Sequence, residues 1–468
     1  MRTEKDSLGT KELQDSIYYG VQTARAVENF PISGWKAHPS FIKGTVEIKK
    51  AAALVHQGLG VLPKEKAEVI VKAADEILSG KLRDQFVVDV FQAGAGTSHN
   101  MNTNEVIANR ALELLNHKKG EYEIISPNDH VNMGQSTNDV IPTAIRLAVL
   151  FEIKEFLPKL EKLEQAFLKK SCEFYPILKS GRTHLQDATP IRLGQEFSGY
   201  AANLSRHKEK ISKTSEDLYA LGLGGTAVGT GLNTHPSYRE KVAQQLNLQT
   251  GLPLKPAANY FEAMQSMAVF AFLSSTVKNL TLDLIRIAND FRLLASGPNT
   301  GLAELILPAV QPGSSIMPGK INPVLAEMLN MVCFYLVGCD SSVSYAVQAG
   351  QLELNVMMPL LAYLLPTSIT ILGNALEAFS DKCVSGLQAD QGRCEDYAEK
   401  TLSIVTALNP YIGYLKAAEI AKESQKTGKR IRDLVLEKGL LPKEKLDEVL
   451  DIPKMTEPEI PGKTKEKV

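Results

Sequence analysis

The sequence contains 468 residues, of which 44% are hydrophobic and 22% are charged, values typical of a soluble globular protein of about three domains or one large elongated unit. Its 52 basic and 53 acidic residues give a formal net charge of −1, which removes the simplest argument for a nucleic-acid partner, a broadly basic surface. Five scattered cysteines do not form a disulfide framework, so we expect a reducing compartment.

The first part of the chain, residues 1–140, mixes shorter helical patterns with glycine-rich loops such as Gln92–Ser98. We predict that it forms an N-terminal domain. The opening residues alternate charged and polar side chains and lack the apolar run of a signal peptide, so we expect a cytoplasmic protein.

Long segments with helical periodicity dominate residues 141–395. Between Ile145 and Phe167, apolar residues recur at steps of three and four, which predicts one helix face turned toward a core. Similar patterns occupy Thr189–Leu221, Tyr260–Ala295, Pro323–Val347 and Asn355–Phe379. No series of alternating strands separates these segments, so the sequence predicts an all-α fold with a central helical bundle domain. Shorter helical patterns over residues 396–468 predict a small C-terminal helical domain.

One segment of this region, Leu354–Leu376, has no charged residue and is long enough to cross a bilayer. It contains several polar residues and two prolines, and no lysine or arginine lies between Lys320 and Lys382 to set an orientation. We therefore expect a helix buried in a bundle or an oligomer interface, and no membrane insertion.

The densest special motif is QPGSSIMPGKINP, residues 311–323. It is not a phosphate-binding P-loop, because five residues separate Gly313 from Gly319 and because Ile321 occupies the place of the magnesium-binding Ser or Thr. Composition alone leaves two interpretations open. The motif is either a helix start rich in turn-forming residues, or an anion site in which Lys320 and two hydroxyls lie near a helix N-terminus.

Three other polar clusters interrupt the helical patterns: GTSHNMNTNE at 96–105, QSTND at 135–139 and GRTHLQD at 181–187. A single cluster of this kind could be a set of helix caps. Together with the motif at 311–323, they favour recognition of a small anion that accepts many hydrogen bonds, such as a dicarboxylate.

These segments resemble the fumarase/aspartase superfamily. GSSIMPGKINP matches the pattern GSSxMPxKxNP at every fixed position, and further matches cover nearly the whole chain. The resemblance implies an all-α fold and a homotetramer whose central helices pack into one core, with each active site shared by three subunits. It implies a dicarboxylate substrate and no organic cofactor, and no Cys/His spacing predicts a metal site.

Within the superfamily, GAGTS at Gly94–Ser98 and Thr137 in QSTND are similar to aspartases, whereas GGTAVGTG at Gly224–Gly231 is similar to fumarases. On balance the motifs favour deamination of L-aspartate to fumarate and ammonia, by anti-elimination through an aci-carboxylate. Hydration of fumarate to L-malate is the alternative. A non-catalytic structural or binding protein on the same fold is the alternative of another class.

The resemblance implies functional roles for ten residues. Ser314 would be the general base, and His184 would be a second catalytic residue near the amino group. The glycines and prolines around Ser314 indicate a loop that closes over substrate. His99 is not expected to act directly. The implied substrate-binding residues are Thr97, Ser136, Thr137, Asn138, Thr183, Ser315, Lys320 and Asn322.

Overall fold

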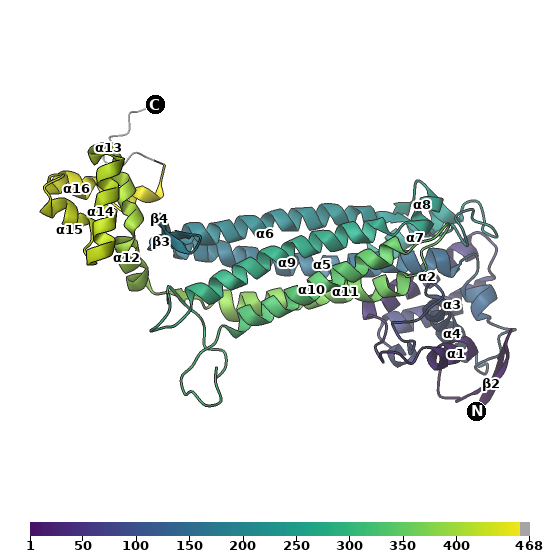
Figure 1. Ribbon diagram of the computed structural model, residues 1–468. Coiled ribbons are helices and arrows are strands. Elements are labelled where there is room, and N and C mark those ends of the chain that lie inside the picture. Colours follow the sequence, from purple (N-terminus) through teal and green to yellow (C-terminus); the bar gives the residue numbers. More distant parts are fainter. Residues whose placement is uncertain (459–468) are drawn as a thin grey trace. The chain divides into compact units, whose positions relative to one another are not determined.

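The computed structural model describes residues 1–458, which form two compact units (Figure 1). Residues 459–468, the end of the predicted C-terminal domain, lie outside the described residues. The division into domains 1–140, 141–395 and 396–468 stays a prediction. Unit 1 comprises Met1–Pro158, His207–Thr281 and Val332–Gly373, and unit 2 comprises Lys159–Arg206, Leu282–Met331 and the described residues from Asn374 onward.

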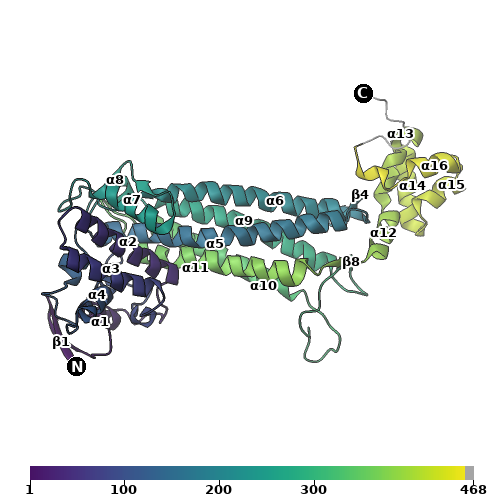
Figure 2. The same ribbon diagram turned by 180° about the vertical axis from the view of Figure 1, so that it is seen from behind.

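The five long helices expected from the periodicity are present, and each contributes residues to both units (Figures 1 and 2). Strands in the described part of the chain are short and pair only in two-stranded sheets. The prediction of an all-α fold is confirmed. The long helices are α5 (Thr137–Glu173), α6 (Leu193–Ser215), α9 (Ala268–Leu294), α10 (Val324–Gln348) and α11 (Met358–Phe379).

The predicted helix from Thr189 is wrong in its first residues. Gln186–Arg192 form strand β4, which pairs antiparallel with β3 (Leu178–Thr183). The β-branched residues Thr189 and Ile191 on either side of Pro190 favour extended backbone. Helix α6 begins only at Leu193. At its start, the side chain of Gln195 accepts a hydrogen bond from the backbone N–H of Arg192 at 2.9 Å. Residues 183 and 184 therefore lie at the tip of a hairpin.

Unit 1 has its core where the apolar faces of α2, α3 and α4 meet, around buried residues such as Val46, Ile70 and Ile107. Besides its parts of the long helices, the unit contains β1 (Arg2–Asp6), β2 (Gly9–Leu13), α1 (Val21–Asn29), α2 (Pro39–Gly58), α3 (Lys64–Leu78), η1 (Arg83–Gln85), α4 (Thr97–Leu114), η2 (Pro127–Val131), η3 (Glu216–Tyr219), β5 (Ala220–Leu221), α7 (Tyr238–Thr250), β6 (Lys255–Pro256) and α8 (Tyr260–Gln265).

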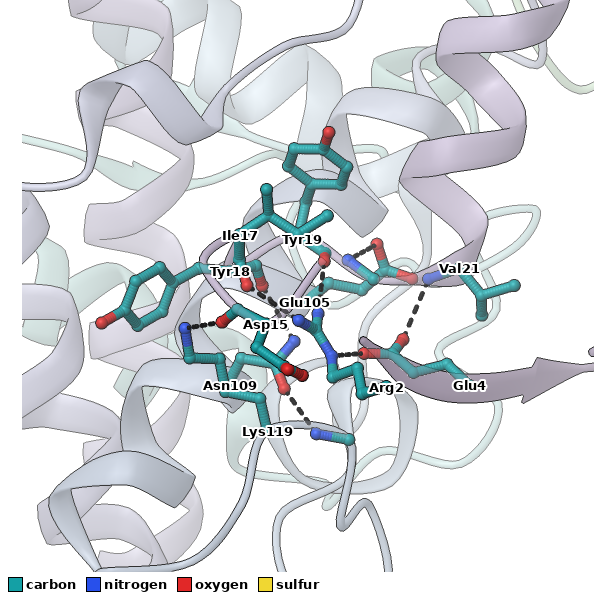
Figure 3. A network of polar contacts seen from close by, with 12 residues as sticks. Arg2, Glu4, Asp15, Ile17, Tyr18, Tyr19, Val21, Glu105, Asn109 and Lys119 are labelled. Atoms are coloured by element: carbon teal, nitrogen blue, oxygen red, sulfur yellow. Dashed lines mark hydrogen bonds and ion pairs between the residues drawn. The ribbon is translucent and has the colours of Figure 1, made fainter. Parts of the chain in front are cut away.

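The N-terminus of α1 is capped by a buried carboxylate from another helix (Figure 3). Glu105 of α4 accepts hydrogen bonds from the backbone N–H groups of Gly20 at 2.8 Å, Gln22 at 2.9 Å and Thr23 at 3.1 Å. Burial raises the pKa of Glu105 to about 7, while the hydrogen bonds act to lower it. A Cβ on Gly20 would lie 2.6 Å from an oxygen of Glu4, so only glycine fits there.

Unit 2 contains an aromatic core in which Phe167, Phe197, Tyr200, Phe291 and Phe379 pack against one another. A second core joins the small helices that follow residue 400. The remaining elements of this unit are β7 (Leu305–Ile306), η4 (Ser380–Val384), β8 (Gln388–Ala389), α12 (Gln391–Lys400), η5 (Leu402–Leu408), α13 (Asn409–Ile412), α14 (Tyr414–Thr427), α15 (Ile431–Glu437), α16 (Lys443–Val449) and η6 (Lys454–Thr456).

Among residues 1–458, three helical segments are long and apolar enough to cross a membrane by length and composition alone: Ala268–Leu294, Val324–Gln348 and Met358–Val384. In the most apolar 18 residues of each segment, 33%, 39% and 61% of the residues, respectively, are buried within the chain. The large apolar side chains of α10 are exposed at Met331, Phe334 and Tyr345. The segment predicted to be a buried helix thus forms α11, whereas α9 and α10 present apolar surface that the single chain leaves uncovered.

Candidate active site

Thr97 and the Ser136–Asn138 segment lie together in unit 1, where the N-termini of two helices meet. Thr97 is the first residue of α4 and Thr137 the first of α5, and their hydroxyl oxygens are 3.1 Å apart. The first N–H groups of a helix lack partners within the helix, and the helix dipole favours negative charge there. This carboxylate-binding group, defined as Thr97 and Ser136–Asn138, can therefore hold an anion.

The start of α5 is fixed by Asp139, which the sequence reasoning missed. Its buried carboxylate accepts hydrogen bonds from the backbone N–H groups of Ser136, Gly224 and Thr226, each at 2.9 Å. Burial raises the pKa of Asp139 to about 6, while these bonds act to lower it. Asn138 donates from Nδ2 to the carbonyl of Ala227 at 2.8 Å. The QSTND cluster is thus hydrogen-bonded to the loop after β5. The Asp at the end of this cluster was the sequence signal that could have predicted how the start of α5 is fixed.

Thr183 and His184 lie at the tip of the β3–β4 hairpin in unit 2. Thr183 pairs with Gln186, and the two residues between them, His184 and Leu185, both have φ of 58°. Residues other than glycine seldom adopt this left-handed conformation, and such strain is concentrated at functional sites. The hairpin is anchored by Arg182, whose guanidinium lies 2.8 Å from the fully buried carboxylate of Glu304. The His184 side chain is exposed at a fixed turn.

Ser314, Ser315, Lys320 and Asn322 lie in a loop without helix or strand, which we call the Ser314 loop (residues 311–323). In Figure 1 it lies between α9 and α10 and projects away from the helices of unit 2. Two hydrogen bonds join the ends of the loop, which we call its neck (Gly313, Lys320 and Asn322). Gly313 N donates to the carbonyl of Lys320 at 2.8 Å, and Asn322 Nδ2 donates to the carbonyl of Gly313 at 2.6 Å. Asn322 therefore holds the loop together in this conformation.

The Ser314 hydroxyl oxygen accepts hydrogen bonds from the backbone N–H groups of Met317 at 2.9 Å and Ile316 at 3.3 Å. Two donors on one oxygen favour its deprotonated form. In the part of the chain that the structure describes, Lys320 makes no ion pair, so its charge is available to an anion.

Within unit 1, four of the ten predicted residues lie together. Thr97 and Thr137 are in contact, and Ser136 and Asn138 adjoin Thr137 in the chain. Within residues 1–458, no hydrogen bond joins Ser314 to Thr183 or His184. The same residues contain no group of three or more His, Cys, Asp or Glu side chains that could hold a metal ion. The assignment of the ten residues to one active site stays a prediction.

His99, which neighbours Thr97 in sequence, points into the core of unit 1. Its ring stacks on Phe41 with centroids 4.3 Å apart, and its Nε2 lies 3.0 Å from the hydroxyl of Thr45. Burial, and secondly the charge of Lys49, lower the pKa of His99 to about 3, so this imidazole is neutral at physiological pH.

Comparison with known proteins connects these groups to one family. A family described as lyase matches residues 9–338, and one described as fumarase C C-terminus matches residues 404–457. The chain is 50% identical to an aspartate ammonia-lyase from a Bacillus species over 99% of both chains. It is 45% identical to the aspartate ammonia-lyase of Escherichia coli K12 over 98% of this chain and 96% of that one.

The chain belongs to the fumarase/aspartase superfamily. The predictions of the family and of a lyase are confirmed. Solved structures of superfamily members agree with the fold. A fumarate lyase from Brucella melitensis superposes with a TM-score of 0.95 at 45% identity, over 98% of this chain and 100% of that one. A class II fumarase from Schistosoma mansoni superposes with a TM-score of 0.94 at 38% identity, over 98% and 99%.

Proposed function

We propose that this protein catalyses the reversible deamination of L-aspartate to fumarate and ammonia in the cytoplasm, without an organic cofactor. The full-length similarity to aspartate ammonia-lyases carries the choice of substrate. The meeting of the α4 and α5 N-termini at the hydroxyls of Thr97 and Thr137 supports it chemically, because this arrangement suits a carboxylate.

In the proposed reaction the substrate's β-carboxylate binds at the carboxylate-binding group. Removal of the adjacent C–H proton turns this carboxylate into a doubly charged aci-carboxylate before the amine leaves. Hydroxyl and N–H donors aimed at that charge stabilise the intermediate more than the substrate, and each such donor typically contributes about 10²–10³ in rate. Ser315 of the Ser314 loop completes this set of donors.

Ser314 is the proposed general base. The N–H groups of Ile316 and Met317 already point at its oxygen, and they lower the free energy of an alkoxide. A positioned general base contributes about 10²–10⁴ in rate. Lys320 binds the α-carboxylate, together with Asn322 once that side chain releases the carbonyl of Gly313. Asn138, Thr183 and His184 surround the amino group.

The proposed enzyme is a homotetramer in which three subunits contribute to each active site. Two features support this arrangement: within the described part of unit 2 no hydrogen bond joins Ser314 to Thr183 or His184, and the apolar faces of α9 and α10 are uncovered. Phe272, Leu282, Met331 and Phe334 are each at least half exposed. Burying one such side chain stabilises an assembly by about 1.5–3 kcal/mol. Lys278 and Asp340, which pair at 2.6 Å between α9 and α10, suit a helix bundle better than lipid.

The decisive assay adds fumarate with and without ammonium and follows the loss of ultraviolet absorbance. The proposal predicts loss only with ammonium, and aspartate as the product. Loss without ammonium and formation of malate would make the protein a fumarate hydratase. No loss under either condition would favour a non-catalytic protein on this fold.

A further inference from the structure

Lys49 of α2 is a buried basic residue that hydrogen bonds connect to the carboxylate-binding group. Its side chain is fully buried, with a relative exposure of 0%, and its Nζ donates to Asn132 Oδ1 at 2.8 Å and to Gln135 Oε1 at 3.0 Å. Both acceptors are uncharged amide oxygens. Among residues 1–458, no carboxylate lies within ion-pair distance of Lys49. A buried ammonium without a carboxylate in direct contact is costly, so its presence calls for a function.

Hydrogen bonds connect Lys49 to the hydroxyl that faces the site. Asn132 Oδ1, which accepts from Lys49, also accepts from Asn100 Nδ2 at 3.2 Å. The same Asn100 Nδ2 lies 3.4 Å from Thr137 Oγ1, which in turn contacts Thr97. Three successive contacts therefore link the ammonium to the carboxylate-binding group.

The second acceptor acts on the same segment of chain. Gln135 immediately precedes Ser136, and its Nε2 donates to the carbonyls of Val131 at 3.1 Å and Met133 at 3.2 Å. Asn132 Nδ2 donates to the carbonyl of Gln135 at 3.1 Å. The turn before α5 is thus built around the ammonium, and its geometry depends on Lys49.

The titratable groups around Lys49 come from several elements. Burial lowers the pKa of Lys49 to about 7, and Asp139 at the start of α5 partly opposes this shift. His99 of α4 stays neutral near Lys49. On α7, the Asp139 charge adds to burial in raising the pKa of Tyr238. Two groups on other elements packed against α2 have partners of their own: Asp75 of α3 pairs with Lys50, and His130 of η2 lies 2.9 Å from Lys66 Nζ.

We propose that Lys49 is a positioning residue for the dicarboxylate: its ammonium fixes Asn132 and Gln135, and through them Thr137 and Ser136, and it supplies a positive charge that a bound carboxylate completes. The inference rests on the proposed function, since it assumes a dicarboxylate at this group. A bound anion stabilises the protonated amine, so above neutral pH binding takes up a proton, and affinity falls as pH rises.

Succinate is the probe, because it is a dicarboxylate without a leaving group, and its binding is measured by calorimetry between pH 7.5 and 9. Lys49→Met removes the charge and the donors at similar length. Lys49→Gln keeps an N–H donor without charge. Lys50→Met is the matched control, since Lys50 is the next residue of α2 and pairs with Asp75 at 2.6 Å near the surface.

For the wild type we expect succinate binding to weaken with rising pH, by up to about tenfold per pH unit, the limit for one proton. Heats measured in two buffers of different ionisation enthalpy should show proton uptake at pH 8. Lys49→Met should bind at least about tenfold more weakly at pH 7.5 and lose the pH dependence, because a buried charge is gone. Compared with Lys49→Met, Lys49→Gln should regain more turnover than succinate affinity, because it restores a donor but not the charge. Lys50→Met should match the wild type in both.

Wild-type affinity and unchanged pH dependence in Lys49→Met would overturn the inference, since a side chain that only fills space predicts that result. If both Lys49 variants fail to fold, the wild-type heats still decide, because absence of proton uptake overturns the inference. Fumarate formation from aspartate is assayed separately. Failure of that assay would refute the proposed function, whereas the role of Lys49 would still be decided by succinate binding.

Discussion

The carboxylate-binding group in unit 1 and the Ser314 loop in unit 2 are built in opposite ways. The first lies on two helix N-termini and is backed by the buried side chains of Lys49, Asn100 and Asp139 and by the partly buried Asn132. The Ser314 loop is mostly exposed, and two hydrogen bonds join its ends. The hydroxyl oxygen of Ser314 accepts hydrogen bonds from backbone N–H groups of the same loop. Under the proposed function, the binding surface is therefore preformed, whereas Ser314, the proposed base, lies on a loop that must rearrange.

The largest effect should come from the loop side of this comparison. Ser314→Ala removes the proposed base and should lower kcat by at least about 10², the lower range for a general base. Succinate affinity and the circular dichroism spectrum should stay near wild type. Ser315→Ala, one residue away, is the comparison and should lose less. A near-wild-type kcat in Ser314→Ala would remove Ser314 from this role.

A second substitution tests whether the neck of the loop matters. A Cβ on Gly313 would stand 2.4 Å from the carbonyl oxygen of Lys320, so Gly313→Ala must open the neck and displace Lys320 and Asn322. Displacement of about 1 Å at a site can cost up to about 10² in rate, and we expect a fall in kcat/KM of about 10 to 10². Gly199→Ala in α6, which meets no atom within 4 Å and has no positive φ, should have a smaller effect. Equal rates in the two variants would contradict a role for the neck.

On the preformed side, losses should be smaller and should appear in kcat/KM. Thr137→Val keeps the shape of the side chain and removes the hydroxyl between Thr97 and Asn100. A hydrogen bond to a charged group contributes about 1.5–3 kcal/mol, so kcat/KM should fall about tenfold or more. Because the hydroxyl is proposed to bind the aci-carboxylate more tightly than the substrate, most of the fall should be in kcat. Steady-state kinetics with aspartate measures both parameters, and a rise in KM at unchanged kcat would contradict this role.

The smallest effect on catalysis should come from the buried network of Figure 3. Glu105→Gln would turn an amide NH₂ toward the N–H donors at the start of α1, and should cost about 1–3 kcal/mol of stability while kcat is unchanged. Thermal unfolding and proteolysis of the N-terminal segment report this loss. Glu123→Gln, at an exposed position, is the control. Equal unfolding temperatures for the two variants would show that the carboxylate is not required.

The fold was largely predictable because apolar residues at three- and four-residue steps continue through each long helix. The start of α6 was misplaced because Thr189–Arg192 continue the apolar pattern, while Pro190 and its β-branched neighbours favour a strand. Motif resemblance supplied the predicted site residues. Lys49 was missed for a physical reason: its importance comes from burial and from partners distant in sequence, which no local pattern encodes. Asp139, by contrast, closes the QSTND cluster and could have been found there.

Mixed oligomers test the central claim, that the preformed group and the Ser314 loop meet across subunits, most directly. One chain carries Ser314→Ala and the other carries Thr97→Val with Thr137→Val; the two are coexpressed with different tags and purified together. The account predicts that the mixture forms fumarate faster than either parent, because about a quarter of the sites are intact after random assembly. Activity no higher than that of the parents would mean that both groups of each site come from one chain.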